Sequence, residues 1–355
     1  MKIGIIGGGI TGLTCAYLAA RRDHDVTLFE REGLMCGTSS SSSKLLHGGL
    51  RYLESGHFKL VKEALKERDG WIEKVPHLAR AIPIIFPIYK QSRRSRLKIS
   101  AGLRLYKFLA TDSPFRNFKW LNKFKLLDLE PDLQEKGLIG GYEYYDGQMD
   151  DYALGMWVAR KAKKNGATIH EYSEICEIST DGVIRKTKGE DNNFDFVINA
   201  AGPWAEALCK SMGDRPFKLD LIRGSHLIIN RKLNSAFIFE VPTDNRIFFV
   251  LPWEGRTLLG TTEVRHNQAD AIACSEDEKN YLLAAYNYYF SDNPISGSDI
   301  ISDFSGVRPL IYSTSNFSSA SREYGIFKSG KVISVVGGKW TTSLSLAEKV
   351  TSMLV

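Results

Sequence analysis

The sequence has few cysteines and no long apolar run. Its five cysteines, in 355 residues, are scattered and form no C-x-x-C pair. Because a disulfide framework and a zinc cluster both need cysteines at characteristic spacings, neither is predicted, and we expect a reducing, cytoplasmic location. The longest nearly continuous apolar run, 81–89, contains two prolines and is too short for a membrane-spanning helix. We therefore do not expect the chain to cross a bilayer.

The N-terminus also lacks the charged start, apolar stretch and small-residue cleavage site of a signal peptide, so export is not expected. Hydrophobic residues make up 43% of the chain and charged residues 25%, which excludes disorder as a description of the whole chain. The net charge of +6, from 47 basic and 41 acidic side chains, neither favours nor excludes a nucleic-acid partner.

A glycine-rich turn follows the first predicted strand. Residues 2–6 are apolar and largely β-branched, which is typical of a strand buried on both faces of a parallel sheet. The turn has the pattern G-x-G-x-x-G, which allows close approach of the backbone to a pyrophosphate and close packing of the next helix. Its residues are Gly7, Gly9, Ile10, Thr11 and Gly12.

The elements after the turn complete one βαβ unit. Residues 13–22 are predicted to form a helix whose N-terminal amides face the phosphates. A strand over 26–29 then ends in Glu30, which is placed to accept hydrogen bonds from an adenosine ribose. Because strand, glycines, helix and acid occur in this order and spacing, they predict a Rossmann-like dinucleotide site rather than an empty glycine turn. The pattern does not separate NAD from FAD.

A polar run over 38–44 leads into LLHGGLRYLE at 45–54. A serine-rich run alone is typical of a flexible linker. This one continues into an HGG turn that has a histidine, an arginine and a tyrosine within six positions, which a linker would not need. Its hydroxyls and amides can bind a pyrophosphate or a flavin edge, and Arg51 can hold a phosphate or carboxylate with its planar fork.

The run SSSSSKLLHGGLRYLE, together with GPW, RGSH, LPW, LGTTE, SGVRPL and GGKWTT further along, resembles the FAD-dependent glycerol-3-phosphate dehydrogenase family. Relatives of that family include the glycerophosphate oxidases and the glycine and D-amino-acid oxidases. The resemblance runs to about residue 347. The sequence differs from many members of the family in one respect. It ends soon after the last motif, where longer dehydrogenases continue into a helical C-terminal domain.

The resemblance implies FAD as the cofactor and an α/β fold, in which a Rossmann-like FAD-binding domain joins a mostly antiparallel-sheet α+β substrate domain. The implied cofactor-binding residues are Gly7, Gly9, Ile10, Thr11, Gly12, Glu30, Thr38, Ser39, Ser43, Lys44, Leu46, His47, Ala201, Gly202, Trp204, Gly338, Lys339, Trp340 and Thr341. Four cations are implied to surround the substrate phosphate: Arg51, Arg308, Arg322 and Lys339. His47 and His226 are both candidates for the catalytic base, and the sequence does not rank them.

The implied reaction is oxidation of sn-glycerol 3-phosphate to dihydroxyacetone phosphate, with hydride transfer to flavin N5. Reoxidation by a membrane quinone would make the protein a dehydrogenase, and reoxidation by dioxygen an oxidase. An amine or amino-acid oxidase of the same fold is the alternative enzyme, although four candidate cations favour a phosphate over a carboxylate. A nucleotide-binding, RNA-associated protein is the alternative outside enzymes, and only a basic segment supports it.

The chain is predicted to divide into two units. Segments 1–75, 145–210 and 318–355 form the FAD-binding domain, and 76–144 and 211–317 form the substrate domain. Amphipathic patterns predict helices over 56–74 and 150–165. Strands are predicted near 167–172, 175–179 and 196–199, and a strand-rich, mostly antiparallel region is predicted over 218–263.

The segment 90–125 has eleven basic residues and one acidic residue, a local excess larger than the net charge of the whole chain. Its basic residues are Lys90, Arg93, Arg94, Arg96, Lys98, Arg104, Lys107, Arg116, Lys119, Lys123 and Lys125. Apolar and aromatic residues lie between them at partly helical spacing, which fits a helix on an anionic membrane surface. A solvated basic face over an ordinary core helix is the alternative. No motif supports binding of nucleic acid.

Overall fold

The computed structural model describes residues 1–212, 216–244, 246–312 and 324–355. A six-stranded sheet carries the glycine turn. In sheet order, its strands are β18 (Gly325–Ser329), β19 (Val332–Val336), β11 (Phe196–Asn199), β1 (Lys2–Ile6), β2 (Asp25–Phe29) and β7 (Thr168–His170). Neighbouring strands pair in parallel except for β18, which is antiparallel to β19. The predicted first strand is confirmed, and its apolar side chains are fully buried.

Three helices cover one face of this sheet: α1 (Ile10–Ala20), α5 (Asp151–Lys164) and α8 (Ser343–Thr351). The other face packs on α6 (Ala205–Leu208) and a small antiparallel sheet of β8 (Ile175–Ile178), β9 (Val183–Lys186) and β10 (Asn192–Asn193). The first helix begins three residues earlier than predicted, because Gly9 is already extended and acts as its N-cap. It also ends before residue 22, where the chain turns with a positive φ at Asp23.

A ten-stranded sheet forms the rest of the core. Its main path is β16 (Val264–Arg265), β12 (Leu219–Ile229), β15 (Arg256–Gly260), β14 (Ile247–Trp253), β13 (Ala236–Glu240), β4 (Ala79–Tyr89), β6 (Leu138–Met149) and β3 (Leu45–Leu46). In addition, β17 (Ile300–Ile311) pairs with β12, and β5 (Lys119–Asn122) pairs with β6. All these pairs are antiparallel except β13 with β4, so the predicted mostly antiparallel sheet is confirmed.

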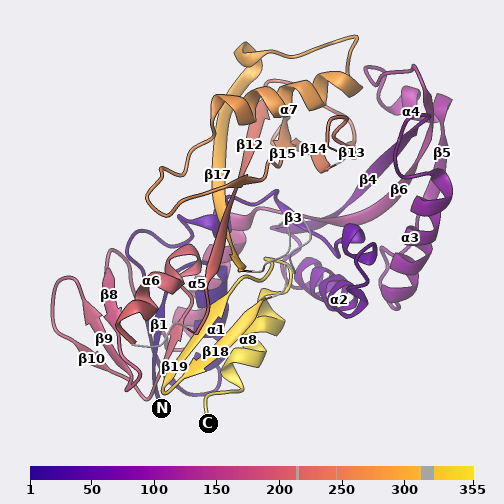
Figure 1. The fold of residues 1–355 in the computed structure, drawn as a ribbon. Coiled ribbons are helices and arrows are strands. Elements are labelled where there is room, and N and C mark those ends of the chain that lie inside the picture. The colour runs from indigo at the N-terminus through magenta and orange to yellow at the C-terminus, as the bar shows by residue number, and fades with distance from the viewer. Residues whose placement is uncertain (213–215, 245, 313–323) are drawn as a thin grey trace.

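Helices lie on both faces of the large sheet. On one face, α7 (Glu276–Tyr289) packs against an aromatic core, as Figure 1 shows above β12 to β15. On the other, α2 (Phe58–Lys74) and α3 (Arg96–Leu109) cover β4 and β6. The short helix α4 (Lys123–Leu129) follows β5. The predicted helices over 56–74 and 150–165 are confirmed as α2 and α5, the latter capped by Asp150.

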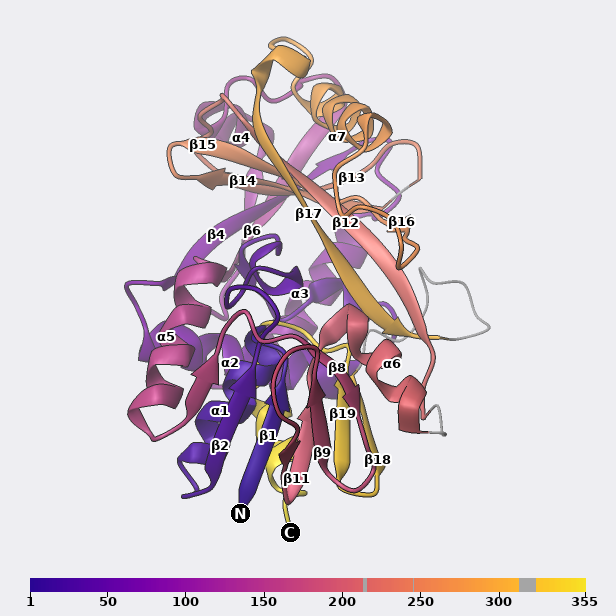
Figure 2. The ribbon, with the colours of Figure 1, turned by 90° about the vertical axis from the view of Figure 1, so that its left-hand side faces the viewer.

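The long pair β12 and β17 joins the two parts of the molecule. Figure 2 shows it running from the large sheet down to the six-stranded sheet, where β17 contacts the short helices η1 (Thr38–Ser40) and η3 (Gly202–Trp204). The division into two domains stays a prediction. However, β3, which was assigned to the FAD-binding unit, pairs with β6 of the large sheet. Among the described residues, no helix is long and apolar enough to span a bilayer.

Candidate active site

One cavity of about 790 Å³ lies where the carboxyl ends of β1, β2 and β11 meet the large sheet. Ligands of open α/β sheets bind at this edge, and the volume is in the usual range for a ligand pocket. Most of the predicted site residues line it. They are Gly7, Gly9, Ile10, Thr11, Glu30, Thr38, Ser39, Ser43, His47, Arg51, Ala201, Gly202, Trp204, His226, Arg308, Gly338, Lys339, Trp340 and Thr341.

Three predicted cofactor residues do not line the cavity. Gly12 lies inside α1, where an added Cβ would stand 1.9 Å from the carbonyl oxygen of Gly7, so its role is the close packing of the helix. Leu46 is fully buried in the core. Lys44 turns away, and its Nζ donates to Asp151 Oδ1 at 2.6 Å. Arg322, the fourth predicted cation, lies outside the described residues.

The glycine turn fits the pyrophosphate of a dinucleotide. Gly7 has a φ of +106°, and an added Cβ would lie 2.5 Å from a backbone oxygen of Ala200. Glu30 is held at the end of β2, where its Oε2 accepts from the amide of Gly8 at 2.6 Å. Ile10 and Thr11, the first residues of α1, line the cavity beside it, and the N-terminus of a helix favours a bound anion. These residues therefore fit the diphosphate and ribose of FAD.

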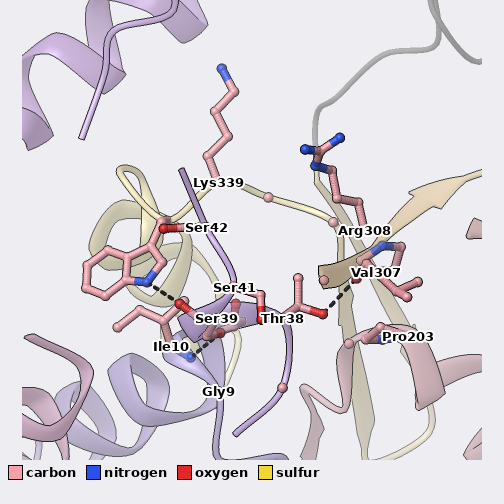
Figure 3. Close-up of a pocket in the computed structure, with 18 of the residues that line it drawn as sticks. Gly9, Ile10, Thr38, Ser39, Ser41, Ser42, Pro203, Val307, Arg308 and Lys339 are labelled. Atoms are coloured by element: carbon pink, nitrogen blue, oxygen red, sulfur yellow. Dashed lines mark hydrogen bonds between the residues drawn. The ribbon is translucent and has the colours of Figure 1, made fainter. Parts of the chain in front are cut away.

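The serine run is ordered, in contrast to a flexible linker. Thr38 Oγ1 donates to the carbonyl of Val307 at 2.7 Å, which ties η1 to β17 (Figure 3). Ser39 Oγ accepts from the amide of Ile10 at 2.9 Å, and its carbonyl accepts from the indole of Trp340 at 3.0 Å. The run therefore contacts three elements from distant parts of the sequence.

Asp151, which the sequence analysis missed, anchors the end of this run. Its Oδ2 accepts from the amide of Ser42 at 3.2 Å and from the hydroxyl of Ser42 at 2.6 Å, while its Oδ1 accepts from Lys44. Burial raises the pKa of Asp151, and the charge of Lys44 acts in the opposite direction. The pair of aspartates at 150–151 was read only as part of a helix start, because nothing in the local pattern indicates a partner more than 100 residues away.

The two candidate histidines have different surroundings. His226 is buried between the ring of Phe304, stacked at 4.8 Å, and Ser43 Oγ, 2.8 Å from Nε2. Burial lowers the pKa of His226 to about 3, and the charges of Arg308 and Lys44 act in the same direction. His47 is only partly buried, and its amide donates to Thr341 Oγ1 at 3.2 Å.

Three predicted cations reach the cavity from separate segments. Arg51 lies in the short helix η2 (Leu50–Leu53), Arg308 near the end of β17, and Lys339 in the turn after β19. In Figure 3 the Arg308 and Lys339 side chains extend to the same side of the cavity. Lys339 Nζ lies 3.4 Å from the centre of the Tyr52 ring. Three cations in the lining of one cavity suit an anionic ligand.

Arg308 has two neighbours that the sequence analysis did not single out. Its Nη2 donates to Thr261 Oγ1 at 3.2 Å, and its Nη1 lies 3.5 Å from Glu263 Oε1. Both residues belong to the LGTTE motif, so the motif pointed to the region but not to the individual contacts. A dinucleotide turn and a cation-lined pocket that share one cavity define a dinucleotide-dependent oxidoreductase.

Comparison with known proteins gives the family. The model of the family described as FAD dependent oxidoreductase matches residues 2–351. The glycerol-3-phosphate dehydrogenase of Pseudomonas tolaasii is 35% identical over 99% of this chain and 71% of its own length. That of Synechocystis sp. is 33% identical over 97% of this chain and 68% of its own. The chain therefore belongs to the FAD dependent oxidoreductase family, in the branch of the glycerol-3-phosphate dehydrogenases.

The solved structures agree. The glycerol-3-phosphate dehydrogenase of Bacillus halodurans, crystallised with FAD, superposes with a TM-score of 0.78 at 27% identity and covers 100% of this chain. With the family match, FAD as cofactor, the Rossmann-like fold and the class of FAD-dependent oxidoreductases are confirmed. The chain spans 64% of that solved chain and about half, 51%, of the mouse mitochondrial relative.

Proposed function

We propose that the protein oxidises sn-glycerol 3-phosphate to dihydroxyacetone phosphate. The observation that carries this proposal is that Arg51, Arg308 and Lys339 all line the cavity that also contains the dinucleotide turn. A phosphate dianion needs several cations, whereas the carboxylate of an amino acid is usually satisfied by one bidentate arginine. The names of the relatives support the same substrate.

Each part of the cavity has a separate task in this proposal. The glycine turn and the start of α1 hold the diphosphate of FAD, and Glu30 holds the ribose. When bound, FAD supplies the hydride acceptor, N5 of its isoalloxazine ring. The three cations hold the phosphate of the substrate and so orient its secondary alcohol. Binding energy from this remote group favours the reacting geometry, and glycerol, which lacks the phosphate, is expected to be a poor substrate.

We assign His47 as the general base that takes the proton of the substrate alcohol. A general base works best when its pKa is near the operating pH, and a pKa of about 3 makes His226 a weak base. His226 is also enclosed between Phe304 and Ser43, which suits a packing and orienting role. His47 lines the same cavity from the HGG turn and is partly exposed.

Anaerobic reduction of the bound flavin tests the substrate. The holoenzyme is mixed with sn-glycerol 3-phosphate, glycerol, lactate or glycine, and bleaching of the flavin absorbance is followed. We expect rapid bleaching by glycerol 3-phosphate and slow bleaching by glycerol. Bleaching by glycine but not by glycerol 3-phosphate would identify an amine oxidase and contradict the proposal. Arg308→Lys is expected to lower kcat/KM for glycerol 3-phosphate although it keeps the charge, because the planar fork is lost.

A membrane quinone as electron acceptor and attachment to the cytoplasmic membrane face belong to the same proposal. They are supported by α3, whose outer face combines cations with two exposed apolar side chains, Leu97 at 82% and Phe108 at 76%. These two residues are eleven positions, or about three helical turns, apart and so lie on one side of the helix. Phe124 of α4 is 78% exposed. An anionic membrane surface is the partner that suits such a combination.

A further inference from the structure

The helix α7 begins with a capping box that is more deeply buried than its role in the helix requires. Ser275 is the N-cap, and Glu278 Oε2 accepts from the Ser275 amide at 3.0 Å. A second capping box, Ser296 with Asp299, has the same pattern at the short helix η5 (Gly297–Asp299). Asp299 is partly exposed, whereas Glu278 is 3% exposed. A helix cap alone does not explain why a carboxylate is taken out of water.

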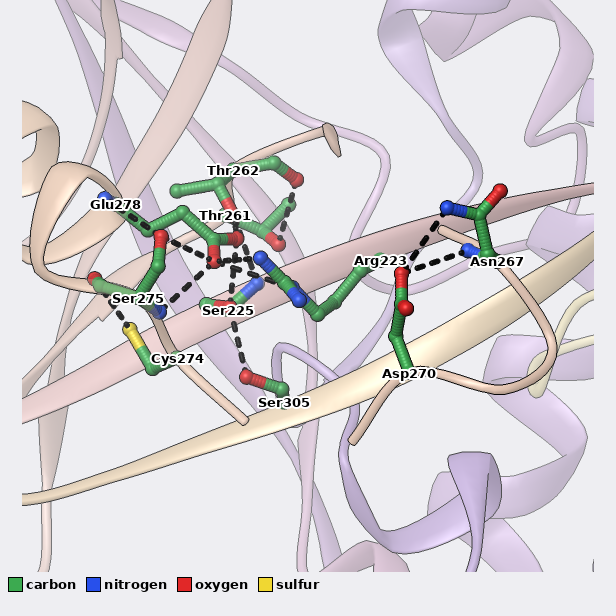
Figure 4. A network of polar contacts seen from close by, with 10 residues as sticks. All are labelled: Arg223, Ser225, Thr261, Thr262, Asn267, Asp270, Cys274, Ser275, Glu278 and Ser305. Atoms are coloured by element: carbon green, nitrogen blue, oxygen red, sulfur yellow. Dashed lines mark hydrogen bonds and ion pairs between the residues drawn. The ribbon is translucent and has the colours of Figure 1, made fainter. Parts of the chain in front are cut away.

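Glu278 reaches across to two segments of the large sheet (Figure 4). Its Oε1 accepts from Ser225 Oγ of β12 at 2.8 Å and from Thr262 Oγ1, after β15, at 2.6 Å. Its Oε2 accepts from Arg223 Nη2 at 2.7 Å. The two segments are also joined directly, because the amide of Ser225 donates to Thr262 Oγ1 at 2.8 Å.

Burial raises the pKa of Glu278, but hydrogen bonds from Thr262, Ser275 and Ser225 and the Arg223 guanidinium together lower it to about 2. Glu278 is therefore a carboxylate at neutral pH and accepts from all of its donors at once. Such a network is strong when every member is satisfied.

The residues next to these partners line the cavity. Ser225 stands between Gly224 and His226, which both line it. Because successive side chains of a strand point to opposite faces, the Ser225 hydroxyl points away from the cavity. We call the two segments that contain Gly224 and Thr261 the cavity wall, since both residues line the cavity. Glu278 thus binds this wall on the side that faces away from the cavity.

Arg308 rests on the front of the same wall. Its Nη2 donates to Thr261 Oγ1, the neighbour of Thr262. It also lies directly over Gly224, where an added Cβ would stand 2.7 Å from Nη2. The position of the guanidinium therefore depends on the positions of the two segments that Glu278 joins.

We propose that Glu278 is a positioning residue for Arg308: it fixes the Gly224 and Thr261 wall from behind and so sets where the guanidinium meets the anionic group of the substrate. The assignment of that group rests on the proposed function. Figure 4 shows the carboxylate of Glu278 with Ser225 and Thr262, and Thr261 next to Thr262. Glu278 itself does not line the cavity.

Glu278→Gln tests the proposal. The amide keeps the shape of the side chain but cannot accept from both Thr262 and Ser225 on one side and from Arg223 and Ser275 on the other. We expect KM for sn-glycerol 3-phosphate to rise about tenfold with a smaller change in kcat, since small displacements of a substrate-holding group have effects of at least this size. The Kd for inorganic phosphate, measured by its perturbation of the flavin absorbance, should rise similarly. The affinity for FAD should not change.

Asp299→Asn is the matched control, because it replaces the equivalent carboxylate of a capping box, and that carboxylate accepts from Ser296 rather than from the segments of Gly224 and Thr261. It should leave KM and the phosphate Kd unchanged. If Glu278→Gln lowers the melting temperature but leaves both constants unchanged, Glu278 is only a helix cap and the proposal is wrong. If the wild-type protein binds phosphate but does not oxidise glycerol 3-phosphate, the proposed function fails, and the phosphate Kd alone decides the role of Glu278.

If Glu278→Gln does not fold, the same measurements are made on Ser225→Ala, because this variant removes one donor to the same carboxylate. We expect a rise of about threefold in KM and in the phosphate Kd, a smaller effect because the carboxylate keeps its hydrogen bonds from Thr262, Arg223 and Ser275. Constants equal to those of the wild-type protein would overturn the proposal.

Discussion

At the scale of single residues, His226 shows how burial decides what a titratable group can do. Its Nε2 faces Ser43, and its Nδ1 has no hydrogen-bond partner within the described part of the chain. A charged imidazolium donates from both ring nitrogens and would need an acceptor at each, and two cations, Arg308 and Lys44, lie nearby. The fold therefore keeps this ring neutral. The stability of the folded protein depends on pH through the same ring.

We expect the pH dependence of stability to report this link. The folded pKa of about 3 lies below the ordinary value of 6.5, so the unfolded chain binds the extra proton first. The stabilisation is fully present above pH 6.5 and is lost as the pH falls toward 3. Denaturant unfolding of the wild-type holoenzyme and of His226→Gln, compared between pH 7.5 and 5, measures the difference. If both proteins lose the same free energy of unfolding over this range, His226 is not the group responsible.

Gly9 allows a test in which cofactor binding and folding can be separated. Its φ of −77° is ordinary, so a larger residue is compatible with the backbone. An added Cβ, however, would lie 2.9 Å from Ser39 Oγ and would enter the cavity. We expect Gly9→Val to fold but to lose FAD, which the flavin absorbance after gel filtration measures.

Gly70→Val is the control for this variant, since Gly70 is exposed in α2 and has no atom within 4 Å of an added Cβ. It should keep the flavin. A yellow Gly9→Val protein with the wild-type flavin content would contradict the assignment of the glycine turn to the pyrophosphate.

At the scale of secondary-structure elements, a buried polar network joins α2, α3 and β6 to the HGG turn. Asp146 of β6 accepts from Arg68 Nη1 of α2 at 3.0 Å and from the Tyr106 hydroxyl of α3 at 2.8 Å. The amide of Gly48, next to His47, donates to the same carboxylate at 3.2 Å and to the Tyr106 oxygen at 2.9 Å. The network thus fixes the turn that carries the proposed base.

Asp146→Ala is expected to lower the free energy of unfolding by about 3 kcal/mol, because it leaves the charge of Arg68 buried with fewer partners. The cost stays at the lower end of the range for a broken buried pair, since Asp69 still accepts from Arg68 at 2.8 Å. Urea unfolding measures the change. Glu135→Ala, which breaks the exposed pair with Lys123, should change stability by less than about 1 kcal/mol. Equal losses in both variants would contradict the role of burial.

Local pattern was sufficient for the elements around the glycine turn, because each is determined by neighbours in sequence: β1, α1 and β2 lie close to their predicted positions. It was not sufficient for residues whose role depends on distant partners. Asp146 contacts Tyr106, Asp151 contacts Lys44 and Glu278 contacts Ser225, each 40 or more residues away in the sequence. The local pattern around these three carboxylates therefore does not indicate their partners. The proposed ranking of His47 over His226 rests on the burial of the two rings, which is a property of the packed molecule.

At the scale of the whole molecule, the charge distribution is the main unexplained feature. Four of the eleven cations of segment 90–125 form ion pairs with glutamates outside the segment, which reduces its effective excess: Arg94, Lys98, Lys119 and Lys123. The inner face of α3, with Ile99, Leu103 and Tyr106, packs on the core. This is what the alternative, a solvated basic face over an ordinary core helix, predicts. The outer face, however, exposes the apolar side chains of Leu97 and Phe108 among cations. A solvated basic face does not explain these exposed apolar side chains.

We expect the holoenzyme to bind vesicles that contain anionic lipids and not neutral vesicles. Each engaged cation contributes about 1 kcal/mol near an anionic surface, so four or five, with a few inserted apolar groups, are sufficient for binding at low salt. Because the Debye length falls to about 3 Å at 1 M ionic strength, salt should release the protein. Co-sedimentation with vesicles measures the bound fraction.

The variant with both Phe108→Ser and Phe124→Ser separates insertion from simple attraction. It removes two exposed apolar groups, at 76% and 78% exposure, without changing the charge, and we expect at least about tenfold weaker binding to anionic vesicles. Tyr172→Ser removes an aromatic side chain of similar exposure, 82%, next to β7 of the six-stranded sheet, and should bind like the wild-type protein. Equal binding to neutral and anionic vesicles, or none to either, would assign the segment to a solvated basic face. The argument for a membrane quinone over dioxygen would then be lost, because it rests on this surface.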